Sequence, residues 1–106
     1  MAKKDLEQLQ MLQHNLQQLL VQKQQFQLQL NEIDSAAKEL KDAKQAYKII
    51  GNVMLLSDKE TLEKELNAKK DMFELRIKNI EAQENRLRNK SDELQKQVVK
   101  ELKNDD

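Results

Sequence analysis

The acidic and basic side chains are the first place in this chain to look for chemistry. Neighbouring carboxylates such as Asp92 and Glu93 could act as a general acid and base, but that chemistry needs an enclosed site to shift their pKa values. His14 is the only histidine, and no cysteine exists to help it bind a metal. Short basic clusters such as Lys69 with Lys70 have acidic neighbours. We therefore predict no catalytic residues, no metal site, no cofactor and no enzymatic activity.

Composition narrows the function classes further. The 106 residues include 19 basic and 19 acidic side chains, 3% aromatics, one Gly, and neither Pro nor Cys. A neutral chain with so few aromatics is a poor candidate for nucleic-acid binding. No apolar run approaches the roughly 18 residues of a membrane span, and the N-terminus lacks the apolar core of a signal peptide. These features predict a cytoplasmic protein, and the absence of Pro favours long helices.

A seven-residue repeat of apolar side chains runs through the first long segment, residues 4–45. Nine of the ten a and d positions are apolar over nearly five heptads, which indicates a left-handed coiled coil. We call these ten positions the seam of the first segment: Leu9, Leu12, Leu16, Leu19, Lys23, Phe26, Leu30, Ile33, Ala37 and Leu40. Lys23 is its polar member, and such a residue more often fixes register than performs chemistry. A helix of roughly 60 Å at 1.5 Å per residue needs a partner helix.

The only glycine lies between two short apolar runs near the middle of the chain. Residues 46–50 and 53–56 are β-prone, and Gly51-Asn52 stands between them. Gly51 can supply the positive φ that a type II′ turn needs at its first central position. We therefore predict a β-hairpin over residues 46–56. The alternative is a plain loop between two helices, but a mere loop would be more polar.

A second long helix is predicted over residues 58–103. Ser57 and Glu60 have the spacing of a capping box that would start it. Apolar side chains recur every seven residues in a strong column: Leu66, Phe73, Ile80, Leu87 and Leu94. A companion column is partly polar: Lys70, Ile77, Glu84, Ser91 and Val98. These two columns form the seam of the second segment.

The simplest fold is mainly α, a single domain over residues 1–106 in which two long helices form an antiparallel coiled coil joined by one β-hairpin. Both termini then meet at the end away from the hairpin. An isolated two-stranded ribbon is marginal in water, so other hairpins must cover this one. We therefore predict oligomerisation through the hairpin residues Tyr47, Ile49, Ile50, Gly51, Val53, Met54, Leu55 and Leu56.

These residues resemble a known family. The stretch AYKIIGNVML, residues 46–55, is similar to the Tyr-Lys-x-x-Gly-x-hydrophobic hairpin of beta-class prefoldin subunits. The QK…LNE pattern within residues 22–32 and the IEAQENR stretch at 80–86 are also similar. The resemblance covers nearly the whole chain, and room for a single hairpin points to the beta class. It fits archaeal prefoldin beta and the eukaryotic beta-class paralogues, and the short chain without extensions favours the archaeal type.

The resemblance implies much that the residues alone do not. Prefoldins are ATP-independent holdase chaperones, built as hexamers of two alpha-class and four beta-class subunits. Their hairpins assemble into a β-barrel platform that carries six coiled coils. Non-native proteins are held between the distal tips and passed to a group II chaperonin. The implied partners are thus an alpha-class subunit, further beta copies, client proteins and the chaperonin.

Client binding requires apolar side chains within reach of an unfolded chain. Candidates lie near both termini, either off the seam or within the part of the seam that fraying would expose: Leu6, Leu9, Met11, Leu12, Leu16, Leu20, Leu94, Val98, Val99 and Leu102. On the residues alone, this surplus more often widens a coiled-coil interface. The resemblance favours client contact.

Two further interpretations stay open at this stage. Residues 8–31 hold ten Gln and one charged residue, which suits either a neutral solvated helix face or adaptable hydrogen bonding to extended clients. The whole chain is also compatible with a structural coiled-coil adaptor or tether without general client binding. The hairpin argues against the adaptor, because a tether has little use for an apolar β-ribbon at its bend, whereas a subunit that assembles through hairpins needs one.

Overall fold

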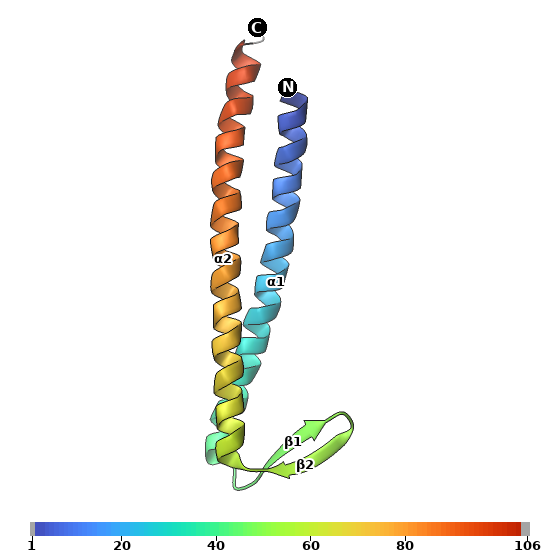
Figure 1. The fold of residues 1–106 in the computed structure, drawn as a ribbon, viewed down its shortest axis with the longest axis vertical. Helices are drawn as coiled ribbons and strands as arrows, with labels where there is room; N and C mark the ends of the chain where they lie inside the picture. The colour runs from blue at the N-terminus through green and yellow to red at the C-terminus, as the bar shows by residue number, and fades with distance from the viewer. Residues whose placement is uncertain (1, 105–106) are drawn as a thin grey trace. The chain divides into compact units, whose positions relative to one another are not determined.

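Two long helices and one β-hairpin make up the computed structural model, which describes residues 2–104 (Figure 1). Helix α1 (Ala2–Asp42) is followed by strands β1 (Ala46–Ile50) and β2 (Val53–Ser57) and by helix α2 (Lys59–Asn104). The mainly helical fold and its single hairpin are thus confirmed. Met1, Asp105 and Asp106, which the prediction of a single domain includes, lie outside the described residues.

The chain divides into two compact units, and each is described by itself. The terminal unit combines residues 1–24 with 78–106, and the hairpin unit spans residues 25–77. In each unit a stretch of α1 packs against an antiparallel stretch of α2. In the hairpin unit, for example, Phe26 contacts Phe73 with ring centroids 5.7 Å apart, and Asp34 pairs with Lys70 at 3.4 Å.

Burial follows the heptad pattern on both helices. All ten seam positions of α1 are buried or half-buried, and so are the ten positions of the two α2 columns. The companion column is the more deeply buried of the two, although it is the more polar. Four of its five members are at most 9% exposed: Ile77, Glu84, Ser91 and Val98. Polar side chains at heptad positions of α2 therefore lie in the interface between the helices.

An aromatic pair strengthens the hairpin unit. Phe26 and Phe73 meet with their ring planes tilted by 38°, an arrangement that favours the edge of one ring near the face of the other. The Arg76 guanidinium lies over the Phe26 ring, 5.6 Å from its centroid, within cation–π range. Leu40 and Ile77 are buried in the same unit.

Helix α1 ends earlier than predicted, at Asp42 rather than near residue 45. No glycine or proline stands there, so the stop comes from tertiary structure. The Lys59 ammonium donates hydrogen bonds to the carbonyl oxygens of Lys41 at 2.7 Å and Ala43 at 3.4 Å. A cation at a helix C-terminus satisfies carbonyls that have no partner within the helix. The prediction missed this because Lys59 is distant in the sequence.

The predicted capping box at Ser57 is wrong. Ser57 is the last residue of β2 and pairs with Ala46, so it belongs to the ladder rather than to the helix. Asp58 takes the capping place instead: its carbonyl accepts from the Leu62 amide at 3.0 Å, and its carboxylate accepts from the Thr61 hydroxyl at 3.2 Å. Helix α2 consequently starts at Lys59, one residue later than predicted.

The hairpin itself has the predicted turn. Ile50 pairs with Val53, so Gly51 and Asn52 form a two-residue loop. Gly51 has a φ of +60°, and no other described residue has a positive φ. A positive φ at the first central position alone fits type II′ and not type I′, which needs two. In Figure 1 the ribbon projects from the helix ends that it connects.

Candidate functional site

The hairpin carries the largest group of exposed apolar side chains in the described chain. Residues opposite each other in an antiparallel pair share a face, so the register defines two faces. One face is entirely apolar and consists of Tyr47, Ile49, Met54 and Leu56. All four side chains are between 52% and 67% exposed. None of the residues that the structure describes covers this face, so it is a candidate interaction surface.

The second hairpin face is partly anchored to α2. Ala46 is buried, and the Lys48 ammonium pairs with the Glu65 carboxylate at 3.0 Å. Toward the turn, Ile50, Val53 and Leu55 of this face are again exposed. The hairpin thus contacts α2 near its base, and its apolar side chains are exposed toward its turn. The exposure of all seven large apolar side chains predicted for oligomerisation agrees with that prediction but does not test it.

A buried ion pair interrupts the seam of the terminal unit. Lys23 Nζ lies 2.8 Å from Glu84 Oε1, and their side chains are only 20% and 4% exposed. Arg88 Nη2 lies 3.7 Å from the other carboxylate oxygen of Glu84. The sequence singled out Lys23 as a seam residue but gave no partner, because the pairing depends on how the two helices align.

Beyond Leu9 and Val98, the seam of the terminal unit becomes acidic. Continuing the repeat by one position places Asp5 on α1 and Glu101 on α2, and both are half-buried. One oxygen of Glu101, Oε2, is buried without a hydrogen-bond partner among the described residues. Two half-buried carboxylates therefore stand where a continued repeat would place apolar side chains, so this layer adds little apolar burial between the helices.

The ten predicted client-binding residues all fall in the terminal unit and separate into two groups. Leu9 and Val98 are buried, so they are accessible only if the helices separate, whereas Leu12, Leu16, Leu20 and Leu94 are half-buried and partly accessible. Leu6, Met11, Val99 and Leu102 are exposed, between 47% and 67%. The alternative, that apolar residues off the seam widen the interface between the two helices, therefore explains half-buried Leu20. It does not explain the four exposed residues.

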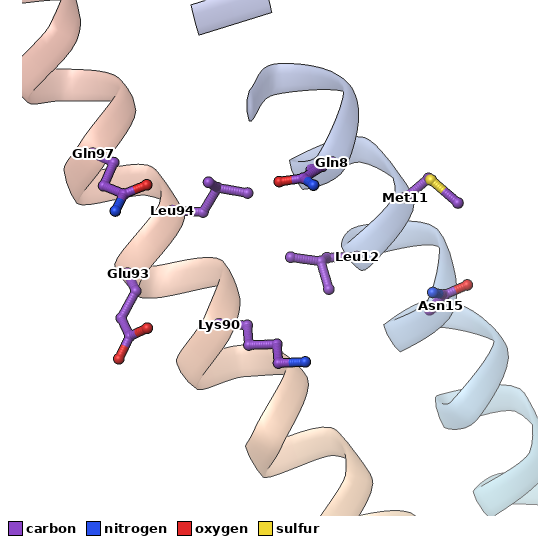
Figure 2. Close-up of a pocket in the computed structure, with 8 residues that line it drawn as sticks. All are labelled: Gln8, Met11, Leu12, Asn15, Lys90, Glu93, Leu94 and Gln97. Carbon is purple, nitrogen blue, oxygen red and sulfur yellow. The ribbon is translucent and has the colours of Figure 1, made fainter. Parts of the chain in front are cut away.

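The prediction did not include the polar residues that surround part of this apolar surface. A groove of about 410 Å³ in the terminal unit is lined by Gln8, Met11, Leu12, Asn15, Lys90, Glu93, Leu94 and Gln97 (Figure 2). Figure 2 shows Leu12 and Leu94 pointing toward one another from α1 and α2. A signal was available in the sequence: Gln8 and Asn15 each directly precede a seam residue of α1, which puts them on one flank of the seam.

The remaining candidates from the sequence have ordinary surroundings. His14 lies on the exposed surface, with Gln18 Nε2 3.3 Å from its Nε2. Across residues 2–104, no three His, Asp or Glu side chains gather closely enough to hold a metal ion. In the same range, neither helix has a stretch apolar and long enough to cross a bilayer.

Comparison with known proteins agrees with this architecture. A family model described as "Prefoldin subunit" matches residues 3–105. The chain is 40% identical over 93 residues to the prefoldin subunit beta of Sulfurisphaera tokodaii, covering 85% of this chain and 74% of that protein. It is 41% identical over 100 residues to that of Methanothrix thermoacetophila, covering 92% and 83%.

A solved structure extends the likeness to three dimensions. The crystal structure of the prefoldin beta subunit from Thermococcus strain KS-1 superimposes with a TM-score of 0.90 at 32% sequence identity. The match covers 95% of this chain and 91% of that one. The predicted resemblance is therefore confirmed: the chain belongs to the prefoldin family of chaperone subunits, and the relatives that it matches are beta subunits.

Proposed function

We propose that this chain is a cytoplasmic subunit of an ATP-independent holdase that captures non-native proteins and delivers them to a group II chaperonin. It would work in a hexamer with alpha-class subunits and further beta copies. The observation that carries the proposal is the exposure of Leu6, Met11, Val99 and Leu102 in the terminal unit. Exposed apolar side chains that gather in one part of a protein form a surface suited to binding.

The hairpin supports assembly of such a holdase. Its apolar face of Tyr47, Ile49, Met54 and Leu56 needs a partner surface, and other hairpins offer matching edges and faces. Joining hairpins into a closed β-barrel removes exposed edges altogether. Several terminal units held around one platform would then bind a single client together, and multivalency raises a weak affinity by orders of magnitude.

Met11 illustrates why the binding would be promiscuous. Its side chain is 67% exposed, and methionine is unbranched and polarizable, so it adapts to differently shaped apolar surfaces. Binding and release would then depend on how much apolar surface the client exposes, and no nucleotide would be required.

Suppression of aggregation by the assembled oligomer tests this function. Replacing Met11, Val99 and Leu102 with Ser removes three exposed apolar side chains from the terminal unit. A matched control also introduces three Ser residues, in place of Leu28, Met72 and Leu75. These three are exposed as well but lie in the hairpin unit. We expect the first variant to lose most of its suppression while keeping its oligomeric mass, and the control to keep both.

The opposite result would favour an adaptor. If the first variant still suppresses aggregation as well as the unsubstituted chain, then the terminal unit is not the client-binding surface. If the unsubstituted oligomer has no effect on any denatured protein, then the holdase proposal itself fails. ATP should change neither result.

A further inference from the structure

The groove in the terminal unit has a composition that purely apolar capture would not need. Its floor consists of Leu12 and Leu94, which are half-buried and point toward one another (Figure 2). Three carboxamides surround this floor, those of Gln8, Asn15 and Gln97, and all three residues are exposed. A surface that binds only apolar side chains would be expected to have aliphatic residues at these three positions.

The polar rim matches uncharged groups that both donate and accept hydrogen bonds. Each carboxamide offers two N–H donors and one carbonyl acceptor. The two charged residues of the groove, Lys90 and Glu93, have opposite signs, so the groove as a whole has no net charge. A bare anion or cation gains little there. A peptide group, with its N–H and C=O, has the complementary chemistry.

The length of the groove fits a short extended segment. Gln8 and Asn15 are one heptad apart on α1, which is about 10 Å along a helix. An extended chain covers that distance in about three residues, and its successive side chains point to opposite sides. Such a segment can therefore direct one side chain to the floor while its peptide groups remain within reach of the rim.

A helical ligand is less suited to this groove. The peptide groups of a helix are already bonded to one another within the helix. They would leave Gln8, Asn15 and Gln97 without main-chain partners. The carboxamides thus distinguish an extended ligand from a helical one, since an extended chain with unpaired peptide groups offers free N–H and C=O groups.

We propose that this groove binds an extended segment of an unfolded chain, with one large apolar side chain against Leu12 and Leu94 and its peptide groups hydrogen-bonded to Gln8, Asn15 and Gln97. The inference rests on the proposed holdase function and specifies the ligand. Unfolded chains would be recognised by their exposed backbone as well as by their apolar side chains. The unit would therefore discriminate against folded proteins that expose an apolar patch.

Methyl NMR of the full chain in its oligomer tests the proposal. Met11 lines the groove and serves as the reporter, whereas Met72 lies in the hairpin unit and serves as the internal control. The probe is the capped, uncharged peptide Ser-Thr-Phe-Thr-Ser. We expect it to shift the Met11 methyl resonance and leave that of Met72 in place. A second peptide, with ester links in place of the two peptide bonds around Phe, should bind at least fivefold more weakly, since it lacks two N–H donors.

Variants locate the hydrogen bonds. Gln8→Leu and Gln97→Leu each remove one carboxamide, and we expect each to weaken binding of the peptide about fivefold. Gln10→Leu is the matched control, because Gln10 is exposed on the same helix but does not line the groove. It should bind the peptide as the unsubstituted chain does.

The proposal is overturned if the ester peptide binds as tightly as the amide peptide, if the Gln8 and Gln97 variants bind unchanged, or if Met11 does not respond. It is also overturned if a preformed amphipathic helix shifts Met11 as strongly as the extended peptide. An aggregation assay run in parallel separates the two proposals. Suppression of aggregation without main-chain recognition would refute only this inference, whereas a lack of suppression would refute the holdase function.

Discussion

Lys23 and Glu84 are 61 residues apart in the sequence, yet the Lys23 ammonium donates a 2.8 Å hydrogen bond to the Glu84 carboxylate across the seam of the terminal unit. The carboxylate is only 4% exposed, so it has lost nearly all its water. A shift of one heptad in the helix alignment would move Glu84 away from Lys23 and beside Leu16 or Leu30. Because an unpaired buried charge costs several kcal/mol, we expect this pair to specify the register.

Removing Lys23 alone should be strongly destabilising. In Lys23→Met the Glu84 carboxylate stays buried, and its remaining cationic neighbour is Arg88 at 3.7 Å. We expect the free energy of unfolding to fall by about 3 kcal/mol, measured by urea denaturation of the full chain. Lys38→Met is the control, because Lys38 is exposed on the same helix, and its effect should stay within about 0.5 kcal/mol.

Replacing both partners should restore stability. Lys23→Met combined with Glu84→Leu makes the seam continuous and apolar, and buried ion pairs replaced in this way are often neutral or stabilising. We expect the double variant to match or exceed the unsubstituted chain. A double variant no more stable than Lys23→Met would show that the ion pair is not the reason for the loss.

The turn of the hairpin gives a second prediction. Gly51 has a φ of +60°, and a Cβ placed on it would meet no other atom within 4 Å. The cost of Gly51→Ala is therefore backbone strain alone, about 1–2 kcal/mol. Asn52→Ala is the control, since Asn52 lacks a positive φ. Thermal unfolding followed by circular dichroism should show a lower midpoint for the first variant only, and equal midpoints would argue against the type II′ turn.

The acidic end of the seam gives a third prediction. Asp5→Leu with Glu101→Leu adds one apolar layer next to Leu9 and Val98, so the helices of the terminal unit should stay closed more firmly. We expect slower hydrogen exchange over residues 5–16, corresponding to about 2 kcal/mol of added stability. If clients reach Leu9 by separation of the helices, suppression of aggregation should fall as well.

A matched variant separates this effect from added hydrophobicity. Glu7→Leu with Lys100→Leu also introduces two leucines, but at exposed positions off the seam. It should leave hydrogen exchange unchanged. Slower exchange in the seam variant with undiminished suppression would mean that the buried seam residues take no part in client binding.

Most of the fold could be predicted because its signals are local. The heptad positions of α1 repeat within one helix, and all ten are buried or half-buried. The turn at Gly51 depends on two adjacent residues, and its φ is as predicted. The positions that failed depend on distant partners: Lys59 ends α1 from across the hairpin, and pairing with Ala46 draws Ser57 into β2.

The candidate site was predicted less completely for the same reason. Exposed Leu6 and Met11 could be found as apolar residues off the seam of one helix. The pairing of Glu84 with Lys23 could not, because the repeat places each residue in the seam of its own helix but does not show which residues lie opposite each other. The groove was missed as well, since Gln8 and Gln97 come to one surface only when the two helices are aligned.

If the uncovered apolar hairpin face holds several chains together, charges placed on it should lower the mass that light scattering measures for the oligomer. Ile49 and Met54 are cross-strand partners on that face, so Ile49→Lys with Met54→Lys places two charges at its centre. Leu28→Lys with Leu75→Lys is the control, at exposed helix positions of the same unit. Mixed with an alpha-class subunit, the unsubstituted chain and the control should give an oligomeric mass, and the hairpin variant should give the mass of separate chains. If the oligomer survives the two hairpin charges, or if the unsubstituted chain stays monomeric with the alpha-class subunit present, then the hairpin face does not hold the chains together.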